Sequence, residues 1–263
     1  MDVDGELVVA GVEIVIALAF VVLSVAALVI VRRRIPVETL EQQHEVAGVC
    51  FAVVGGLYGI ILAFVLVSSW ERYEQARAQT ELEASALGDL YRHSEGFNEP
   101  ARSRLQSAVA AYAESVVQDE WATMTAGHSS QATQEKYYAL WKALLEDRPS
   151  DAWEVALYQN TLEKLDDFAD ARRHRLLYIH AALPAPIWTF LIVFGIATVA
   201  FTYFFGMRHV VPQVIITAVL AGTIAGTLVL VRETQHPFSG GMRVGDDPFR
   251  LVLSHMRTAQ TAP

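Results

Sequence analysis

Four long stretches of the chain consist almost entirely of apolar residues, at positions 7–31, 46–70, 187–205 and 210–231. About 20 apolar residues in a helix cross a hydrocarbon layer of about 30 Å. The first stretch holds a single acidic residue, Glu13, and the other three hold no charged residue. The pattern therefore predicts four transmembrane helices, which form two hairpins separated by a long polar region.

The first stretch has a rival interpretation as a cleavable signal peptide. Such a peptide has an apolar region of about 7–15 residues, with positive charge in front and small residues at a cleavage site behind. Here acidic residues precede the stretch, and Arg32, Arg33 and Arg34 follow it. The order of charges favours a retained transmembrane helix.

Between the two predicted hairpins, apolar residues recur at the spacing of a helix. This pattern is typical of amphipathic helices with one buried face, and no stretch alternates with the period of two that a strand requires. The four series are Trp70, Tyr73, Ala84, Leu87 and Tyr91; Leu105, Val109, Tyr112 and Val116; Tyr137, Leu140 and Leu144; and Tyr158, Leu162, Leu165, Ala169, Leu176 and Ile179. Residues that break helices separate the series, which predicts a helical soluble domain.

Local signals indicate where these helices begin and end. No helix breaker follows the second span, so the first helix of the domain is predicted to continue from it. The fourth helix is predicted to run on to the third span, with a kink or a restart at Pro184 and Pro186. Pro100 suits a helix start, and either Ser150 or Asp151 suits an N-cap.

The predicted fold is an all-α membrane protein with four parts. Residues 1–70 form an N-terminal transmembrane hairpin and residues 71–183 form the helical soluble domain. Residues 184–231 form a C-terminal transmembrane hairpin, and residues 232–263 form a polar tail. Glycine and proline in the tail indicate turns followed by a frayed end.

Composition narrows the possible partners. The chain is 53% hydrophobic and 19% charged, against about 25% charged residues in a soluble domain, so the lipid bilayer is the expected environment. Its net charge is −9, and an acidic chain is poorly suited to bind nucleic acid. The single cysteine, Cys50, excludes both an intrachain disulfide and a cysteine-based zinc site.

Charge near the membrane ends leaves the orientation open. With an even number of spans, both termini and the soluble domain lie on one side. The three arginines after the first span indicate that its connector is cytoplasmic, and Arg208 joins them. Six arginines on the domain side indicate the opposite: Arg72, Arg77, Arg172, Arg173, Arg175 and Arg232.

No motif of an enzyme occurs in the sequence. The glycine-rich phosphate loops, the GxSxG elbow and HExxH are absent, and no two histidines have metal-binding helical spacing. We therefore predict no catalytic residue, no cofactor and no metal site. One acidic series, Glu163, Asp166, Asp167, Asp170 and His174, has a calcium site as its alternative reading, but a solvated helix face is the preferred one.

A second acidic cluster, Asp119 and Glu120 beside Trp121, has two interpretations. In the first, Trp121 lies in the core and the acids are solvated. In the second, Glu120 is buried and pairs with an arginine of another helix, such as Arg172 or Arg175. The sequence does not decide between them.

The scarcity of charged residues in the spans limits the kinds of transport that the protein can perform. Proton-coupled carriers usually hold ionisable residues in mid-membrane, and three of the spans hold none. An apolar pore that gates by dewetting remains possible, and it requires several subunits. Small residues four apart, Gly55 with Gly59 and Ala218 with Gly222 and Gly226, allow close helix contact. Plain helix packing without a pore explains them equally well.

Several short motifs together resemble the bacterial bestrophin-like membrane family. The resemblance extends from about Val46 to Phe249. The motifs are Gly56-Leu57-Tyr58 with Phe64, Trp70-Glu71-Arg72-Tyr73, Glu83-Ala84-Ser85-Ala86-Leu87, Leu90-Tyr91-Arg92, Tyr112, Asp119-Glu120-Trp121 with Met124, Ala171-Arg172-Arg173-His174-Arg175-Leu176, Leu183-Pro184 with Trp188, Phe204-Phe205-Gly206, and Pro237-Phe238-Ser239-Gly240 with Val244.

The resemblance implies a function. It implies a pentameric, anion-permeable channel in the cell membrane, with the helical domain and both termini in the cytoplasm. It further implies that the second span lines the pore, with Tyr58, Ile61 and Phe64 as candidates for the constriction. The long acidic run of the animal calcium clasp is absent, so no calcium site is expected.

The same resemblance singles out residues with a structural role in the domain and the tail. They are Glu83, Glu120, Trp121, Arg172, Arg175, Pro237, Phe238 and Gly240. The alternative to a channel is a non-conducting scaffold or sensor, in which the helical domain binds a partner and the spans anchor it.

Overall fold

The computed structural model describes residues 3–42, 44–149, 151–180, 182–205, 207 and 209–261. Within these residues all regular structure is helical. The chain divides into two compact units, one formed by Met1–Glu71 and Ala182–Gln235 and the other by Arg72–Ala181 and His236–Pro263. We call them the span unit and the domain unit.

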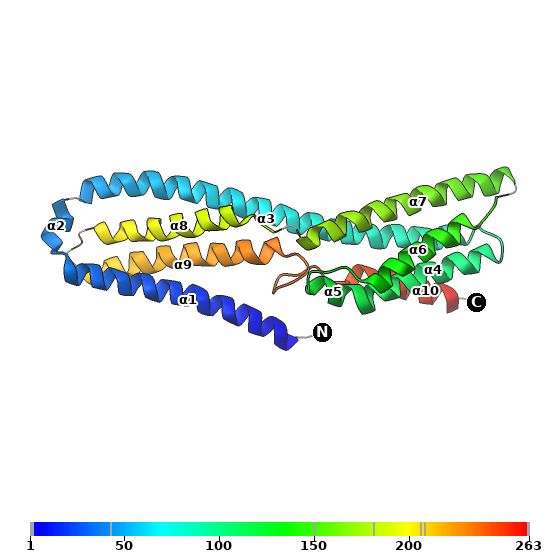
Figure 1. Cartoon of the computed structure of the whole chain (residues 1–263), viewed down its shortest axis with the longest axis horizontal. Coiled ribbons are helices and arrows are strands. Elements are labelled where there is room, and N and C mark those ends of the chain that lie inside the picture. The colour runs from blue at the N-terminus through cyan, green and yellow to red at the C-terminus, as the bar shows by residue number, and fades with distance from the viewer. Residues whose placement is uncertain are drawn as a thin grey trace. The chain divides into compact units, whose positions relative to one another are not determined.

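The span unit contains four helices that are long and apolar enough to cross a membrane (Figure 1). Its elements in chain order are α1 (Val3–Arg34), α2 (Val37–Gln42), the first part of α3 (His44–Ser94), α8 (Ala185–Phe201), η3 (Thr202–Phe204) and α9 (Val210–Gln235). The predicted transmembrane helices thus correspond to α1, α3, α8 and α9. The polar connector between the first two contains the short helix α2.

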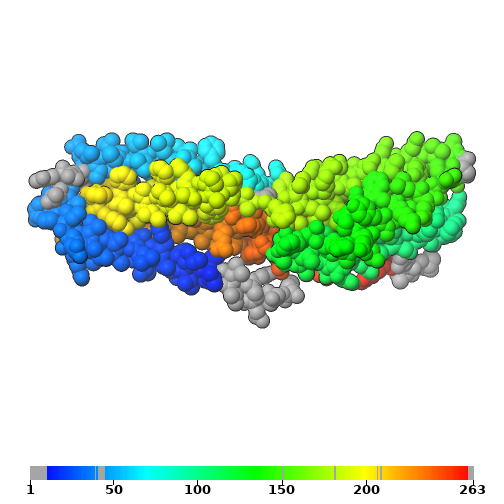
Figure 2. Space-filling model, in the orientation of Figure 1, coloured from blue at the N-terminus to red at the C-terminus, as the bar shows by residue number. Residues whose placement is uncertain are grey.

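Inside the span unit, α9 packs along α1 and also contacts α8. Figure 2 shows α8 on the visible face between α3 and α1. The core of this unit comprises Tyr58, Leu62, Leu191, Val199, Ala221 and Ile224. Large apolar side chains on all four long helices remain exposed, as expected for helices surrounded by hydrocarbon or by other membrane helices.

The small residues of the spans divide between inner and outer faces. At Gly55, an added Cβ would lie 3.5 Å from Cγ2 of Thr198 on α8, and at Gly222 it would lie 3.8 Å from Cγ2 of Val21 on α1. At Gly59 and Gly226 it would meet nothing within 4 Å. Gly55 and Gly222 therefore allow close packing inside the protomer, whereas Gly59 and Gly226 lie on open faces.

A polar cluster closes one end of the span unit. Arg32 Nη1 donates to Gln213 Oε1 at 2.7 Å, and Gln213 Nε2 donates to the carbonyl oxygens of Thr202 and Phe205, each at 2.9 Å. These bonds satisfy carbonyls at the end of α8 and attach the end of α1 to α9. The short connection to α9 follows, and Gly206 and Arg208 in it lie outside the described residues.

The domain unit is built from the rest of α3 and a set of shorter helices. These are α4 (Ala101–Ser115), the π-helical turn η1 (Val116–Glu120), α5 (Trp121–Thr125), α6 (Gln131–Leu145), α7 (Ala152–Leu177), η2 (Tyr178–His180) and α10 (Asp247–Thr261). Ser130 caps α6, and the side chain of Asp151 caps α7 by accepting from Glu154 N at 2.8 Å. The prediction of Asp151 as an N-cap is confirmed, and its alternative Ser150 lies outside the described residues.

The two predicted junctions between a span and a helix of the domain have different outcomes. α3 is one uninterrupted helix, as predicted. α7, however, does not run on to α8: it ends at Leu177, and α8 begins after Pro184. Of the two predicted outcomes at the prolines, the restart is confirmed: Pro184 is the N-cap of α8 and Pro186 lies in its first turn, where a missing backbone N–H breaks no helical hydrogen bond.

The tail also differs from its prediction. It contains turns, and it then forms the helix α10 where a frayed end was expected. Phe249, Leu253 and Met256 lie on one face of α10 and are buried in the core of the domain unit. The spacing of i, i+4 and i+7 is the reason that this polar segment can order as a helix.

Candidate functional site

At the centre of the domain unit lies a fully buried arginine held by two glutamates. Arg175 Nε lies 2.6 Å from Glu83 Oε2, and Arg175 Nη2 lies 2.7 Å from Glu120 Oε2. All three side chains are completely excluded from solvent. Burying charges is costly unless they are paired and hydrogen-bonded, and here every one of them is.

A second arginine and a tyrosine close this arrangement into a ring. Arg172 binds Glu120 with both terminal nitrogens, at 2.8 and 3.0 Å. Its Nη1 also donates to Tyr112 Oη at 2.7 Å, and the Tyr112 hydroxyl donates to Glu83 Oε1. The two carboxylates and two guanidinium groups balance in charge. We call these five residues the charge ring.

Four elements supply the charge ring. Glu83 comes from α3, Tyr112 from α4 and Glu120 from the end of η1, whereas Arg172 and Arg175 lie on one face of α7 because they are three residues apart. π-Helical turns are rare and are frequent at functional sites. Here the turn η1 joins α4 to α5 and ends at Glu120, the residue whose side chain both arginines bind.

The electrostatics of the ring favour its charged form. Burial by itself raises the pKa of Glu120, but Arg175 and Arg172 outweigh burial and hold that pKa below its ordinary value. Burial opposes the charge of Arg175, yet Glu83 and Glu120 raise its pKa well above the usual value. Burial and the neighbouring Glu83 raise the pKa of Tyr112, so its hydroxyl keeps its proton.

Aromatic rings cover the arginines. The guanidinium carbon of Arg175 lies 5.4 Å from the centre of the Trp121 ring and 5.7 Å from that of Phe249. Trp121 Nε1 donates to the carbonyl oxygen of Val244 at 3.2 Å, and its ring lies 6.0 Å from that of Phe238. The segment before α10 therefore packs against the charge ring.

The turns of that segment explain two more of the singled-out residues. Val244 N donates to the carbonyl oxygen of Pro237 at 2.7 Å, which closes a loop. Gly240 within this loop has a φ of +92°, a left-handed conformation that residues with a Cβ rarely adopt. Pro237 and Gly240 thus shape the loop that carries Phe238 and Val244.

The structure decides between the two interpretations of the acidic cluster beside Trp121. The pairing of Glu120 with Arg172 or Arg175 is confirmed, and Glu120 binds both. Sequence reasoning did not connect Tyr112 to this pair, and it missed Phe249. For Phe249 a signal existed, since it begins the apolar series of α10.

The charge ring has the chemistry of a structural clamp. Its carboxylates are held by arginines on both sides and it is closed to solvent, so none of its groups is placed to act on a substrate. Within the described part of the chain, no group of three or more His, Cys, Asp or Glu side chains is placed to hold a metal ion. In the acidic series of α7, Asp167 pairs with Lys164 and Asp170 pairs with Arg173 at the surface.

The lowered pKa of Glu120 predicts a loss of stability in acid. A carboxyl group whose folded-state pKa is depressed contributes stability above its unfolded pKa, about 4.3 for glutamate, and loses it as the pH falls through the folded value. The thermal midpoint of the detergent-solubilised protein should therefore fall below about pH 4.3. In Glu120→Gln this dependence should be shallower, and an unchanged profile would contradict the assignment.

The three pore candidates do not share a face of α3. Tyr58 is only 3% exposed, and its hydroxyl donates to the carbonyl oxygen of Leu191 on α8 at 3.1 Å. Ile61 is 37% exposed and Phe64 is 73% exposed. Tyr58 thus belongs to the core of the protomer, whereas Phe64 is on its outer face.

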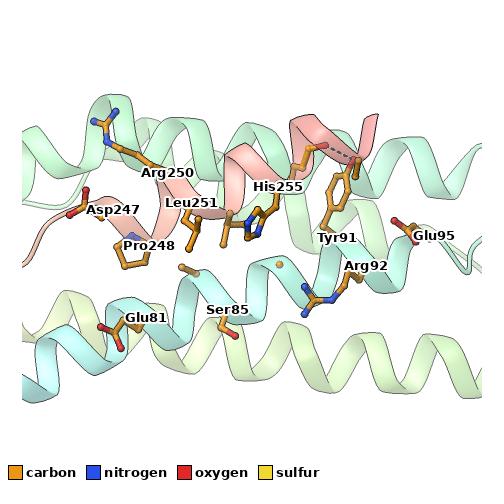
Figure 3. A pocket seen from close by; sticks show the side chains of 15 residues that line it. Glu81, Ser85, Tyr91, Arg92, Glu95, Asp247, Pro248, Arg250, Leu251 and His255 are labelled. Carbon is orange, nitrogen blue, oxygen red and sulfur yellow. Dashed lines mark hydrogen bonds between the residues drawn. The ribbon is translucent and has the colours of Figure 1, made fainter. Parts of the chain in front are cut away.

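A broad groove lies in the domain unit between α3 and α10, with a volume of about 1150 Å³. Figure 3 shows Leu251 and His255 pointing from α10 toward α3. Ala84 and Gly88 contribute to its apolar part, and charged residues such as Arg92 to its rim. The groove is a surface on which another segment of protein could rest.

Four apolar helices long enough to span a membrane, together with a helical unit built on a buried charge ring, define the class as an all-helical membrane protein. The family description "Bestrophin-like domain" matches residues 18–249. The chain belongs to the bestrophin-like family.

Solved structures show the same fold. A bacterial bestrophin homologue from Klebsiella pneumoniae, solved with a mutation, has a TM-score of 0.72 at 16% identity, with 94% of this chain and 99% of that chain covered. The homologue solved by Zn-SAD phasing has a TM-score of 0.71 at 16% identity, again with 94% and 99% covered. No curated protein sequence matches the chain significantly.

Proposed function

We propose that the protein is an oligomeric, anion-permeable channel whose pore is lined by the membrane part of α3. The family is known for ion channels and not for enzymes, and this supports the proposed oligomer and the proposed permeability to anions. The observation that carries the proposal is the uncharged, apolar and outward-facing surface of the membrane part of α3. Its residues 46–70 hold no charge, they expose large apolar side chains, and the same helix continues to Glu83 in the charge ring.

One exposed line on α3 is suited to a lumen. Cys50, Leu57 and Phe64 are seven residues apart, close to two helical turns, and all three are exposed. Phe64 is the largest of them and suits an apolar constriction that gates by dewetting. A Cβ added at Gly56 or Gly59 would meet nothing within 4 Å, so there is free space beside the backbone near this line. We assign the constriction to Phe64 and Ile61 and place Tyr58 behind them as a packing residue.

The remaining parts of the proposal concern assembly and orientation. A pore lined by one helix per chain needs several chains, and a pentamer is the state that the family implies. The domain unit and both termini are proposed to lie in the cytoplasm of a cell with the spans in its plasma membrane. The surplus of arginines on the domain side supports this orientation.

Reconstitution into planar bilayers tests the proposal, and Cys50 provides a built-in probe. Because Cys50 is the only cysteine, a charged, membrane-impermeant thiol reagent should change the current of the wild type and leave Cys50→Ser unaffected. Phe64→Ala should raise the single-channel conductance, since it removes a ring from the constriction. Phe194→Ala on the exposed face of α8 is the matched control and should not.

Silent bilayers with correctly folded oligomer would count against conduction. Currents that respond neither to the thiol reagent nor to Phe64→Ala would place the pore on another helix.

A scaffold or sensor is the second candidate, and the groove between α3 and α10 favours it. A partner segment could lie in this groove without any ion flow. A low-resolution view of the solubilised particle separates the candidates, because a ring with a central hole supports the channel and a dimer without a lumen supports the scaffold.

A further inference from the structure

Besides the groove of the domain unit, the structure has a hollow in the span unit. It lies between α1, α8 and α9 and has a volume of about 370 Å³. This volume is within the range of small-molecule sites. Most of its lining is apolar. The residues that line it include Ile16, Phe20, Ile192, Ile196, Ala225 and Leu228.

One part of the lining is charged. Glu13 from α1 and Arg232 from α9 form an ion pair, with Oε1 and Nη1 3.2 Å apart. The Glu13 side chain is 5% exposed and that of Arg232 is 52% exposed. Trp188, at the start of α8, also lines the hollow. Arg232 lies in the last turn of α9 and Trp188 in the first turn of α8, and tryptophan and arginine are commonly found at the membrane boundary.

The rim of the hollow faces the surroundings of the span unit. Ile16, Ile192 and Ile196 line it and are exposed. Figure 2 shows the surface of α9 in the gap between α1 and α8. An apolar hollow that stays empty forfeits the dispersion contacts of its walls. In a bilayer the material at hand to fill it is an acyl chain.

We propose that this hollow binds a membrane phospholipid, with one acyl chain among the apolar residues and the phosphate on Arg232. A guanidinium group presents five donors in a planar fork that suits phosphate oxygens. Glu13 holds one terminal nitrogen of Arg232 and acts as a positioning residue, while the exposed half of the side chain faces the headgroup region. A free fatty acid presents the same chemistry, but the opening toward the bilayer favours phospholipid.

The proposal is independent of ion conduction, and native mass spectrometry of the full chain in detergent tests it. The probe is palmitoyl-oleoyl phosphatidylglycerol. Ala225→Phe fills the hollow and should weaken binding by about tenfold or more, which corresponds to the loss of about 1.4 kcal/mol. Val219→Phe, on an exposed position of α9 that does not line the hollow, is the matched control and should change binding less than about twofold.

Two further arms complete the test. Arg232→Gln should weaken phosphatidylglycerol binding about tenfold, because a bond to a charged group is lost, and should affect palmitate in the same direction. If Ala225→Phe does not fold, Ile192→Phe at the rim serves instead. Equal binding by wild type, cavity-filled variant and control overturns the proposal. Palmitate that binds more tightly than phosphatidylglycerol also overturns it, because the hollow would then prefer a free fatty acid. Lipid that binds the monomer but not the assembled oligomer overturns it as well, because a second copy of the chain would then occupy the hollow.

Discussion

Replacing Arg175 with methionine is expected to cause the largest loss of stability of any single substitution in the domain unit. Arg175 lies between Glu83 and Glu120 with no access to solvent. Its removal leaves two buried carboxylates that face each other without the cation between them. Removing one partner of a buried ion pair typically costs about 3–5 kcal/mol. A fraction of the Arg175→Met molecules is therefore expected to misfold.

Denaturant unfolding of the detergent-solubilised protein measures this effect, followed by tryptophan fluorescence because Trp121 lies on Arg175. Arg173→Met is the control: Arg173 is two positions away, is 65% exposed and pairs with Asp170 at the surface, so its loss should cost less than about 1 kcal/mol. Adding Glu83→Gln to Arg175→Met should recover part of the stability, because Arg172 still pairs with Glu120 and a neutral amide is cheaper to bury than the unpaired charge of Glu83. Equal midpoints for the two arginine variants would contradict a structural role of the charge ring.

The second large effect is expected at Gly195 on α8. A Cβ there would lie 2.8 Å from Tyr58 Oη and 3.2 Å from Ile224 Cγ2. Both neighbours are buried in the core where α3, α8 and α9 meet. Gly195→Ala should therefore destabilise the span unit by about 1–3 kcal/mol, the usual cost of overpacking. The thermal midpoint in detergent is the measurement.

Gly226→Ala is the matched control, because the added Cβ meets nothing within 4 Å and alanine favours a helix. It should leave the midpoint unchanged or raise it. Tyr58→Phe removes the oxygen nearest to the new methyl group, so Tyr58→Phe with Gly195→Ala should be more stable than the sum of the single effects predicts. Additive effects would show that the clash with Tyr58 is relieved in some other way.

The sequence by itself determined the membrane character of the protein and most of its helices. Uncharged runs of about 20 residues have no stable place in water, so the four spans were predictable. The continuity of α3 was predictable as well, because nothing between the second span and Glu83 interrupts a helix. Asp151 was readable as a cap since its side chain can bond to a free backbone N–H of the first turn.

Only the tertiary structure decided which faces meet. Tyr58 and Phe64 lie in the same apolar run, and a span without a polar face carries no periodic signal that separates inside from outside. Glu120 could equally have been solvated, because the partner arginines are more than 50 residues away and only the packing of α7 brings them near. Likewise α10 is ordered by burial of Phe249 against the domain core. Short-range pattern specifies helices, whereas the choice of buried contacts depends on how distant helices pack.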